Sequence, residues 1–128
     1  MNGKRWKRWK TAVYNIGYHL IWCRKYRRKV LVGEVAERLK ELLLQKAREI
    51  EVEIMPDHVH LFVKTVPTNS PYFIVQQLKG YTSRVLREEF PFLKSRLPSL
   101  WTRSYYCESV GHISEETIRR YIEDQKGK

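Results

Sequence analysis

Two short groups of residues, far apart in the chain, have the types and spacing of a catalytic site. His58 and His60 flank Val59 in an apolar run, and Tyr121 precedes Gln125 by four residues near the C-terminus. Alternation along a strand turns both histidines to one face, and one helical turn puts Tyr121 and Gln125 on one face of a helix. Where these two faces meet, two imidazoles and an amide oxygen would hold a divalent cation beside a phenol.

Such a site suits the cleavage of a phosphodiester. Neutral ligands leave the cation its full charge for polarising a phosphate, and an open coordination position would admit the substrate. Ligand type alone favours zinc or a late transition metal over magnesium. A phenol that attacks phosphorus keeps the strand as a phosphotyrosine ester, which supports strand transfer rather than hydrolysis.

Each of these signals is weak alone, because paired surface histidines and half-buried helical tyrosines are common. Tyr121 has an ordinary pKa of about 10, so a nearby cation or arginine would have to favour its phenolate. The sequence does not identify the group that takes the proton. Asp57 could add a carboxylate next to His58, although a turn after Pro56 is the more usual role for such an Asp.

The positive charge of the chain is concentrated at its N-terminal end. The 128 residues carry a net charge of +11, and residues 1–33 contain ten Lys or Arg and no acidic residue. Basic clusters attract phosphate backbones, and the interleaved Trp6, Trp9 and Tyr26 suit unstacked bases. We expect a nucleic acid partner, ahead of a solvated tail or a membrane surface. The clusters are Lys4, Arg5, Lys7, Arg8 and Lys10, then Arg24, Lys25, Arg27, Arg28 and Lys29.

Length and composition predict a basic tail over residues 1–10 and one domain over 11–128. No apolar run approaches the roughly 18 residues that span a bilayer, and the N-terminus lacks the apolar stretch of a secretory signal, so we expect a cytoplasmic protein. Cys23 and Cys107 form no redox motif. Both are expected to be buried strand thiols, and the sequence leaves open whether they are bridged.

The predicted elements follow the order β-α-β-β-α-β with one further helix. Strands are expected over 11–23, 50–55, 58–66 and 104–110, helices over 33–49 and from 71 to about 90, an irregular stretch over 91–103, and a last helix after Ser114. Ser70 and Ser114 are the expected N-caps of the last two helices. This order is typical of the ferredoxin-like split βαβ fold, an α+β class with two helices on one face of an antiparallel sheet.

That fold would bring the two groups together. Val59, Leu61 and Val63 should meet the two crossover helices, which leaves His58 and His60 on the open face. The last helix is free to cross that face and deliver Tyr121 and Gln125.

These segments resemble a known family. Residues 55–61 (MPDHVHL) are similar to the H-U-H motif, where U is a bulky apolar residue, of the small single-tyrosine transposases of insertion sequences. Residues 121–125 match that family's tyrosine-x-x-x-glutamine signature. The stretches 19–28, 79–84, 101–106 and 110–112 also agree in order, and the resemblance covers about residues 11–126.

The resemblance implies an enzyme that moves an element as single-stranded DNA. His58, His60 and Gln125 would bind Mg²⁺ or Mn²⁺, and Tyr121 would attack the scissile phosphate to give a 5′-phosphotyrosine link and a free 3′-OH. The resemblance further implies a homodimer that binds hairpins near the element ends, and in many members the tyrosine helix reaches the metal site of the other subunit. The residues expected to contact DNA are Arg24, Lys25, Arg27, Arg28, Lys79, Arg84 and Arg103.

Other interpretations remain open. A non-catalytic nucleic-acid-binding module could stack bases on Phe62, Tyr105 and Tyr106, but it would leave the histidine pair unexplained. A metal-dependent hydrolase with a water nucleophile would not need Tyr121. A domesticated nuclease or a replication initiator would use the same chemistry. Without the resemblance, Lys79 and Arg84 would be solvated residues on a helix, and Arg103 could reach a phosphate or pair with an acid. His19 would be packed, and Trp101 would lie in the core.

Overall fold

The computed structural model describes residues 7–9, 12–14, 16–25, 30–47, 50–96, 99–109 and 115–126. Its main sheet is antiparallel and has the strand order β4-β5-β3-β6. The strands are β3 (Ile16–Cys23), β4 (Ile50–Met55), β5 (His58–Thr65) and β6 (Tyr106–Ser109). The first main strand therefore lies between the third and the fourth, which is the split βαβ arrangement. The predicted α+β fold class is confirmed.

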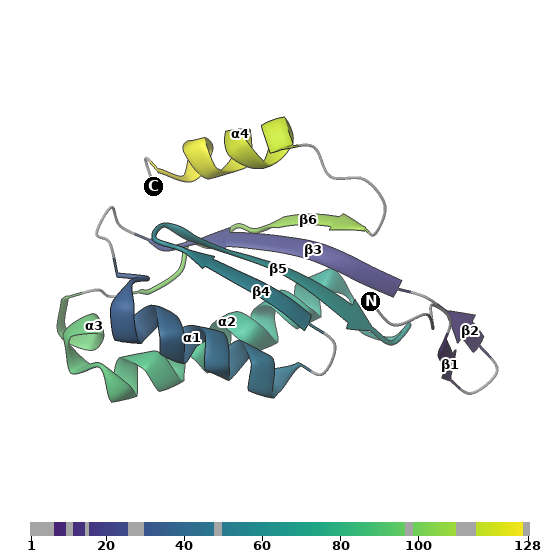
Figure 1. Ribbon diagram of the computed structural model, residues 1–128, viewed down its shortest axis with the longest axis horizontal. Coiled ribbons are helices and arrows are strands. Elements are labelled where there is room, and N and C mark those ends of the chain that lie inside the picture. Colours follow the sequence, from purple (N-terminus) through teal and green to yellow (C-terminus); the bar gives the residue numbers. More distant parts are fainter. Residues whose placement is uncertain are drawn as a thin grey trace.

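Helices lie on both sides of this sheet. Helices α1 (Gly33–Lys46), α2 (Pro71–Glu89) and α3 (Pro91–Arg96) lie on one side, and α4 (Glu115–Gln125) lies on the other, over β3 and β6 (Figure 1). Both crossover helices share one face, as crossovers of one hand require. The predicted open face is therefore the one that α4 crosses.

The alternation of β5 separates the core from the open face. Val59, Leu61 and Val63 are buried against α1 and α2, in one cluster with Leu39 and Leu78. Each such side chain stabilises the fold by about 1.5–3 kcal/mol. The alternate residues of the strand, including both histidines, keep partial exposure. Burial of one face of β5 thus forces the histidine pair onto the other.

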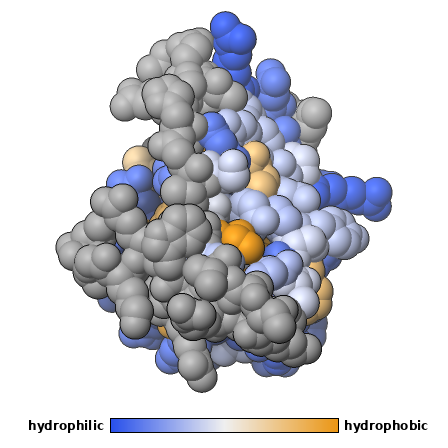
Figure 2. Space-filling model, turned by 90° about the vertical axis from the view of Figure 1, so that its right-hand side faces the viewer, coloured by the Kyte–Doolittle hydropathy of each residue, from blue (hydrophilic) through white to orange (hydrophobic). Residues whose placement is uncertain are grey.

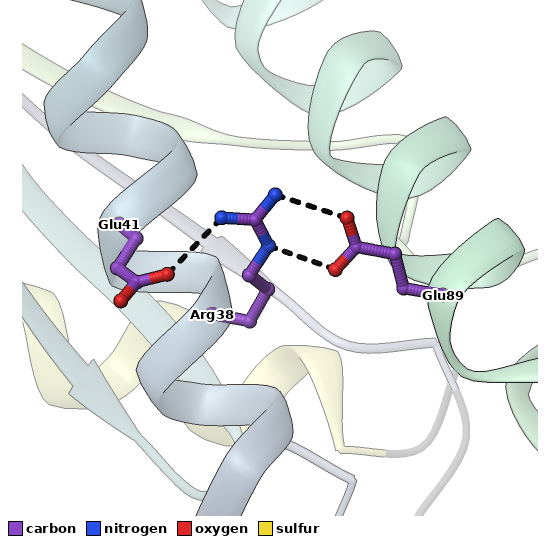
Figure 3. A network of polar contacts seen from close by, with 3 residues as sticks. All are labelled: Arg38, Glu41 and Glu89. Carbon is purple, nitrogen blue, oxygen red and sulfur yellow. Dashed lines mark hydrogen bonds and ion pairs between the residues drawn. The ribbon is translucent and has the colours of Figure 1, made fainter.

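Local signals fix the ends of α2 and its alignment with α1. The Ser70 side chain accepts a hydrogen bond from the Phe73 amide at 3.1 Å, which confirms the predicted N-cap. Arg38 of α1 donates to both carboxylate oxygens of Glu89, at 2.8 and 2.9 Å, and to Glu41 at 3.1 Å (Figure 3). This two-pronged ion pair joins the two helices on the solvent side.

Several boundaries differ from the prediction. The segment predicted as one strand over 11–23 is divided into β2 (Ala12–Tyr14) and β3, and β2 pairs with β1 (Lys7–Trp9), inside the segment predicted as a tail. Strands β1 and β2 pair with each other outside the main sheet. Strand propensity does not reveal which partner a strand will have. The stretch predicted as irregular contains α3, because Pro91 ends one helix and is also a favourable first residue of the next.

Three smaller findings complete the fold. Helix α1 ends at Lys46 rather than 49, and β6 is shorter than predicted. Cys23 and Cys107 are free thiols in the structure; Cys23 is buried, but Cys107 is exposed on the edge strand β6, so the prediction of a buried thiol is wrong there. No helix in the described ranges is long and apolar enough to cross a membrane. Ser114, the other predicted N-cap, lies outside the described residues.

Candidate active site

The histidine pair belongs to a cluster of rings on the open face. In the β3–β5 register His60 faces Ile21, His58 faces Cys23, and His19 faces Phe62. Residues opposite one another in antiparallel strands share a face. The His19 ring lies 5.8 Å from that of His60 and 4.9 Å from that of Phe62, measured between centroids. His19 is thus packed against His60 and Phe62, as the sequence suggested.

Asp57 holds His58 in a defined orientation. Its Oδ1 lies 2.8 Å from His58 Nδ1. With the proton on Nδ1, the imidazole donates to the carboxylate and presents Nε2 as a free lone pair. Burial raises the pKa of the Asp57 carboxyl, but the hydrogen bond and charge of His58 outweigh burial, so the net pKa lies below its usual value. Asp57 is therefore both a turn residue and an ionised partner for His58.

His60 is held in its neutral form. Burial lowers its pKa, and the neighbouring His19 lowers it further. A neutral imidazole is the form that binds metals. Within the described ranges no three His, Cys, Asp or Glu side chains are grouped closely enough to hold a metal ion. A third ligand from the described protein would therefore have to be of another type, such as an amide.

Gln125 supplies an amide on the same small depression as Asp57, the partner of His58. Among the described residues it is one of the few buried polar side chains, with 8% exposure, and it lies on the last turn of α4. The residues around this depression are Cys23, Arg24, Asp57, Ile122, Gln125 and Lys126. Helix α4 therefore brings Gln125 to the carboxylate that orients His58.

Tyr121 lies one turn earlier on α4, over β6. Its ring centroid is 5.9 Å from that of Tyr106, and its hydroxyl is 2.9 Å from Ser104 Oγ. Burial raises the pKa of Tyr121 to about 12, against the opposing effect of the Ser104 hydrogen bond, so the phenol is protonated at neutral pH. Among the described residues its hydroxyl bonds to Ser104 and to neither histidine. Helix α4 thus brings Gln125 to the depression that Asp57 borders, while the Tyr121 hydroxyl is directed to Ser104.

The predicted DNA-contacting residues have different surroundings. Arg84 and Arg103 are exposed, and the Arg84 guanidinium lies 5.7 Å from the centre of the Tyr81 ring. Lys25 is half-buried. Arg24 borders the depression beside Gln125, and its Nε is buried without a partner in the described part of the chain. Arg27 and Arg28 lie outside the described residues.

Lys79 is not a solvated helix residue. Its Nζ donates to the carbonyl oxygens of Thr102 and Ser104, both at 2.8 Å. Burial lowers its pKa to about 8. Ser104, which contacts both Lys79 and Tyr121, was not singled out from the sequence, because no local pattern links these three positions.

A larger cavity, of about 520 Å³, lies at the opposite end of the sheet, between the end of α1 and the start of α2. Lys46, Val66, Phe73 and Gln77 are among its lining residues. Hydrophilic side chains cover most of the described surface at this end (Figure 2). None of the residues predicted to act in catalysis borders this cavity, so its size does not make it the candidate site.

Comparison with known proteins identifies the family of the chain. The family described as "Transposase IS200 like" matches residues 12–125. The chain belongs to the IS200-like transposase family. It is 41% identical over 129 residues to ISDra2 transposase TnpA of Deinococcus radiodurans, covering 95% of this chain and 92% of that one. The resemblance inferred from the motifs is confirmed.

Two further comparisons agree. The transposase for insertion sequence element IS200 of Salmonella typhimurium is 34% identical over 119 residues, which cover 88% of this chain and 78% of the relative. A crystal structure described as a transposase from Deinococcus radiodurans superposes with a TM-score of 0.82 at 38% identity, covering 94% of this chain and 98% of that one. The IS200-like family thus accounts for both the sequence and the fold.

Proposed function

We propose that this IS200-like transposase cleaves single-stranded DNA with Tyr121 and rejoins strands through a 5′-phosphotyrosine ester. The observation that carries the proposal is the position of α4, which crosses the same sheet face that presents the histidine pair. The proposed nucleophile and a buried amide, one turn apart, are thereby carried to the face that holds the two imidazole donors.

The reaction is a transesterification. The Tyr121 oxygen forms a bond to the scissile phosphorus, and the bond from phosphorus to the 3′ oxygen of the preceding nucleotide breaks. The phenol proton ends on that 3′ oxygen, which leaves a free 3′-OH. Attack of a 3′-OH on the phosphotyrosine reverses the step and joins strands, because the ester keeps the energy of the broken bond.

The donor set fits a divalent cation. His58 presents a free Nε2 because Asp57 binds its other nitrogen, His60 is neutral, and the buried Gln125 amide lies beside Asp57. These three side chains would hold Mg²⁺ or Mn²⁺, as the family resemblance also implies. When bound, the cation would supply positive charge to the scissile phosphate.

The substrate is proposed to be a hairpin at each end of the element, bound by a homodimer. The support is family membership together with the net charge of +11, concentrated before residue 34. Arg84 and Arg103 are exposed on the described surface and are proposed to contact the phosphate backbone. Neither a membrane nor a nucleotide cofactor is part of the proposal.

A covalent-adduct assay tests the proposal. Wild type and Tyr121→Phe are mixed with labelled single-stranded oligonucleotides tiled across both flanks of the gene for this chain, with Mg²⁺, Mn²⁺ or a chelator. A denaturation-resistant complex, seen only with wild type and metal, is expected. Tight binding without an adduct would instead indicate a binding module, and cleaved DNA without an adduct would indicate a hydrolase.

A further inference from the structure

The segment between α3 and β6 is held in place by contacts from several elements. The Leu100 carbonyl accepts from the Lys25 amide at 2.8 Å, and the Thr102 amide donates to the Cys23 carbonyl at 3.0 Å. The Trp101 indole donates to Thr82 of α2 at 3.3 Å and packs edge-on against Trp22. Residues 100–102 are therefore fixed against β3 and α2 before the chain reaches Ser104.

Lys79 extends this anchoring to Ser104. Its amine donates to two carbonyls, those of Thr102 and Ser104, from the opposite layer of the molecule. Thr102 is buried, so its carbonyl needs a partner, but Ser104 is exposed and water could satisfy its carbonyl. The bond to the Ser104 carbonyl is therefore not needed to satisfy a buried polar group, and its effect is to fix the position of Ser104. This bond also persists when Lys79 loses its proton, because a neutral amine keeps two N–H donors.

Ser104 in turn contacts the oxygen that would react. Its Oγ lies 2.9 Å from the Tyr121 hydroxyl, and either oxygen can donate. Packing against Tyr106 limits the ring of Tyr121, and the bond to Ser104 holds the position of its oxygen. The Ser104 hydroxyl can both donate and accept hydrogen bonds. It would accept a hydrogen bond from the Tyr121 phenol and donate one to the phenolate.

We propose that Ser104 is a catalytic residue that holds the Tyr121 oxygen, and that Lys79 is a positioning residue that holds Ser104. The catalytic part of this inference rests on the proposed function of Tyr121. It assigns Lys79 a role inside the protein, in place of the DNA contact expected from the sequence.

The contact itself is tested without any reaction. Full-length protein carrying ¹³C at the tyrosine ζ carbon gives one resonance for Tyr121, identified by its absence in Tyr121→Phe. We expect this resonance to shift in Ser104→Ala and in Lys79→Met, and to stay in place in Ser104→Thr, which keeps the hydroxyl. Lys40→Met, on the exposed surface of α1, is the matched control and should not move it. A Tyr121 resonance unchanged by Lys79→Met would overturn the link.

The catalytic part is tested with the same variants in the adduct assay. Ser104→Ala and Lys79→Met should slow adduct formation about threefold to tenfold, the rate equivalent of one hydrogen bond, while Ser104→Thr stays near wild type. Lys79→Arg, which keeps N–H donors, should lose less activity than Lys79→Met.

Measurements of DNA binding distinguish the positioning role of Lys79 from a direct contact between Lys79 and a phosphate. Lys79→Met should leave the affinity for a hairpin oligonucleotide and its salt dependence unchanged. Weaker binding with a shallower salt slope would identify a phosphate contact and overturn the positioning role. Absence of any wild-type adduct would instead refute the proposed function, and with it the catalytic role of Ser104, whereas the Tyr121 resonance would still decide the contact.

Discussion

At the scale of the residue, the two histidines are prepared by different contacts. His58 is oriented by a carboxylate one residue before it, and His60 is kept neutral by burial and by His19. The contact with Asp57 fixes the ring of His58, and the lowered pKa of His60 favours the neutral imidazole, the form that binds metals.

Loss of either histidine should therefore stop the proposed chemistry. His58→Ala or His60→Ala is expected to abolish adduct formation but to keep most of the affinity for hairpin DNA, because the basic residues lie elsewhere. Adduct yield and hairpin binding, measured on the same preparations, check this. Metal-dependent adduct formation at wild-type level in either variant would contradict the metal assignment.

Asp57 should matter for metal binding although it need not touch the metal. Asp57→Ala frees His58 Nδ1 and is expected to weaken Mn²⁺ binding about 10- to 100-fold, the usual cost of losing an outer-shell partner. Calorimetric titration with Mn²⁺ measures this. Glu51→Ala removes an exposed carboxylate from β4 and serves as the control. Equal Mn²⁺ affinity in the two variants would refute the role of Asp57.

At the scale of the element, α2 is defined by a cap at its start and by Pro91 beyond its end. Ser70→Ala removes the bond to the Phe73 amide and should lower the free energy of unfolding by about 1 kcal/mol. Ser83→Ala, in the interior of the same helix, should have the opposite sign, because Ala is the better helix former. Urea unfolding of both variants provides the measurement, and equal shifts would rule out a capping role.

At the scale of the whole molecule, Lys79 joins the helical layer to the face crossed by α4. The unfolded chain holds the Lys79 proton up to about pH 10.5, whereas the folded chain releases it at about pH 8. Between these values the unfolded state binds more protons, so stability should rise with pH. Unfolding of wild type and Lys79→Met across this interval should diverge, with wild type gaining. Parallel curves would contradict the lowered pKa.

The N-terminal charge also acts at this scale. Residues 7–9 pair with β2, so truncation would remove a strand as well as charge. Gln substitutions at Lys4, Arg5, Lys7, Arg8 and Lys10 are therefore the cleaner test, and should weaken single-strand binding. The slope of log affinity against log salt concentration should become shallower by about 0.7 for each phosphate that these side chains neutralise. An unchanged slope would mean that this segment neutralises no phosphate.

The periodicity of the sequence predicted those features of the fold and site that depend on residues close together in the chain. The two faces of β5, the cap of α2 and the pairing of Tyr121 with Gln125 on one helix all follow from spacings of two, three or four residues. The topology followed because few folds accept that order of elements. The exposure of Cys107, by contrast, depends on β6 being an edge strand.

Contacts between distant segments were not predictable in the same way. The pairing of β1 with β2 required knowledge of which strand each would meet. The connection from Lys79 to Ser104 to Tyr121 joins three segments, separated by 25 and 17 positions, through one carbonyl and one hydroxyl. Neither the carbonyl nor the hydroxyl of Ser104 is marked by a sequence pattern. The position of Lys79 on a helix predicted a solvent-exposed side chain.

The edge-on packing of Trp22 and Trp101, with ring centroids 6.0 Å apart and planes at 80°, gives the molecule an optical signal of its own. Two indoles this close couple their electronic transitions, which produces paired circular dichroism bands of opposite sign. Trp101 belongs to the segment that precedes Ser104, so the amplitude of this couplet would report whether residues 100–102 are docked against β3. The docking of residues 100–102 could therefore be followed in solution without a label.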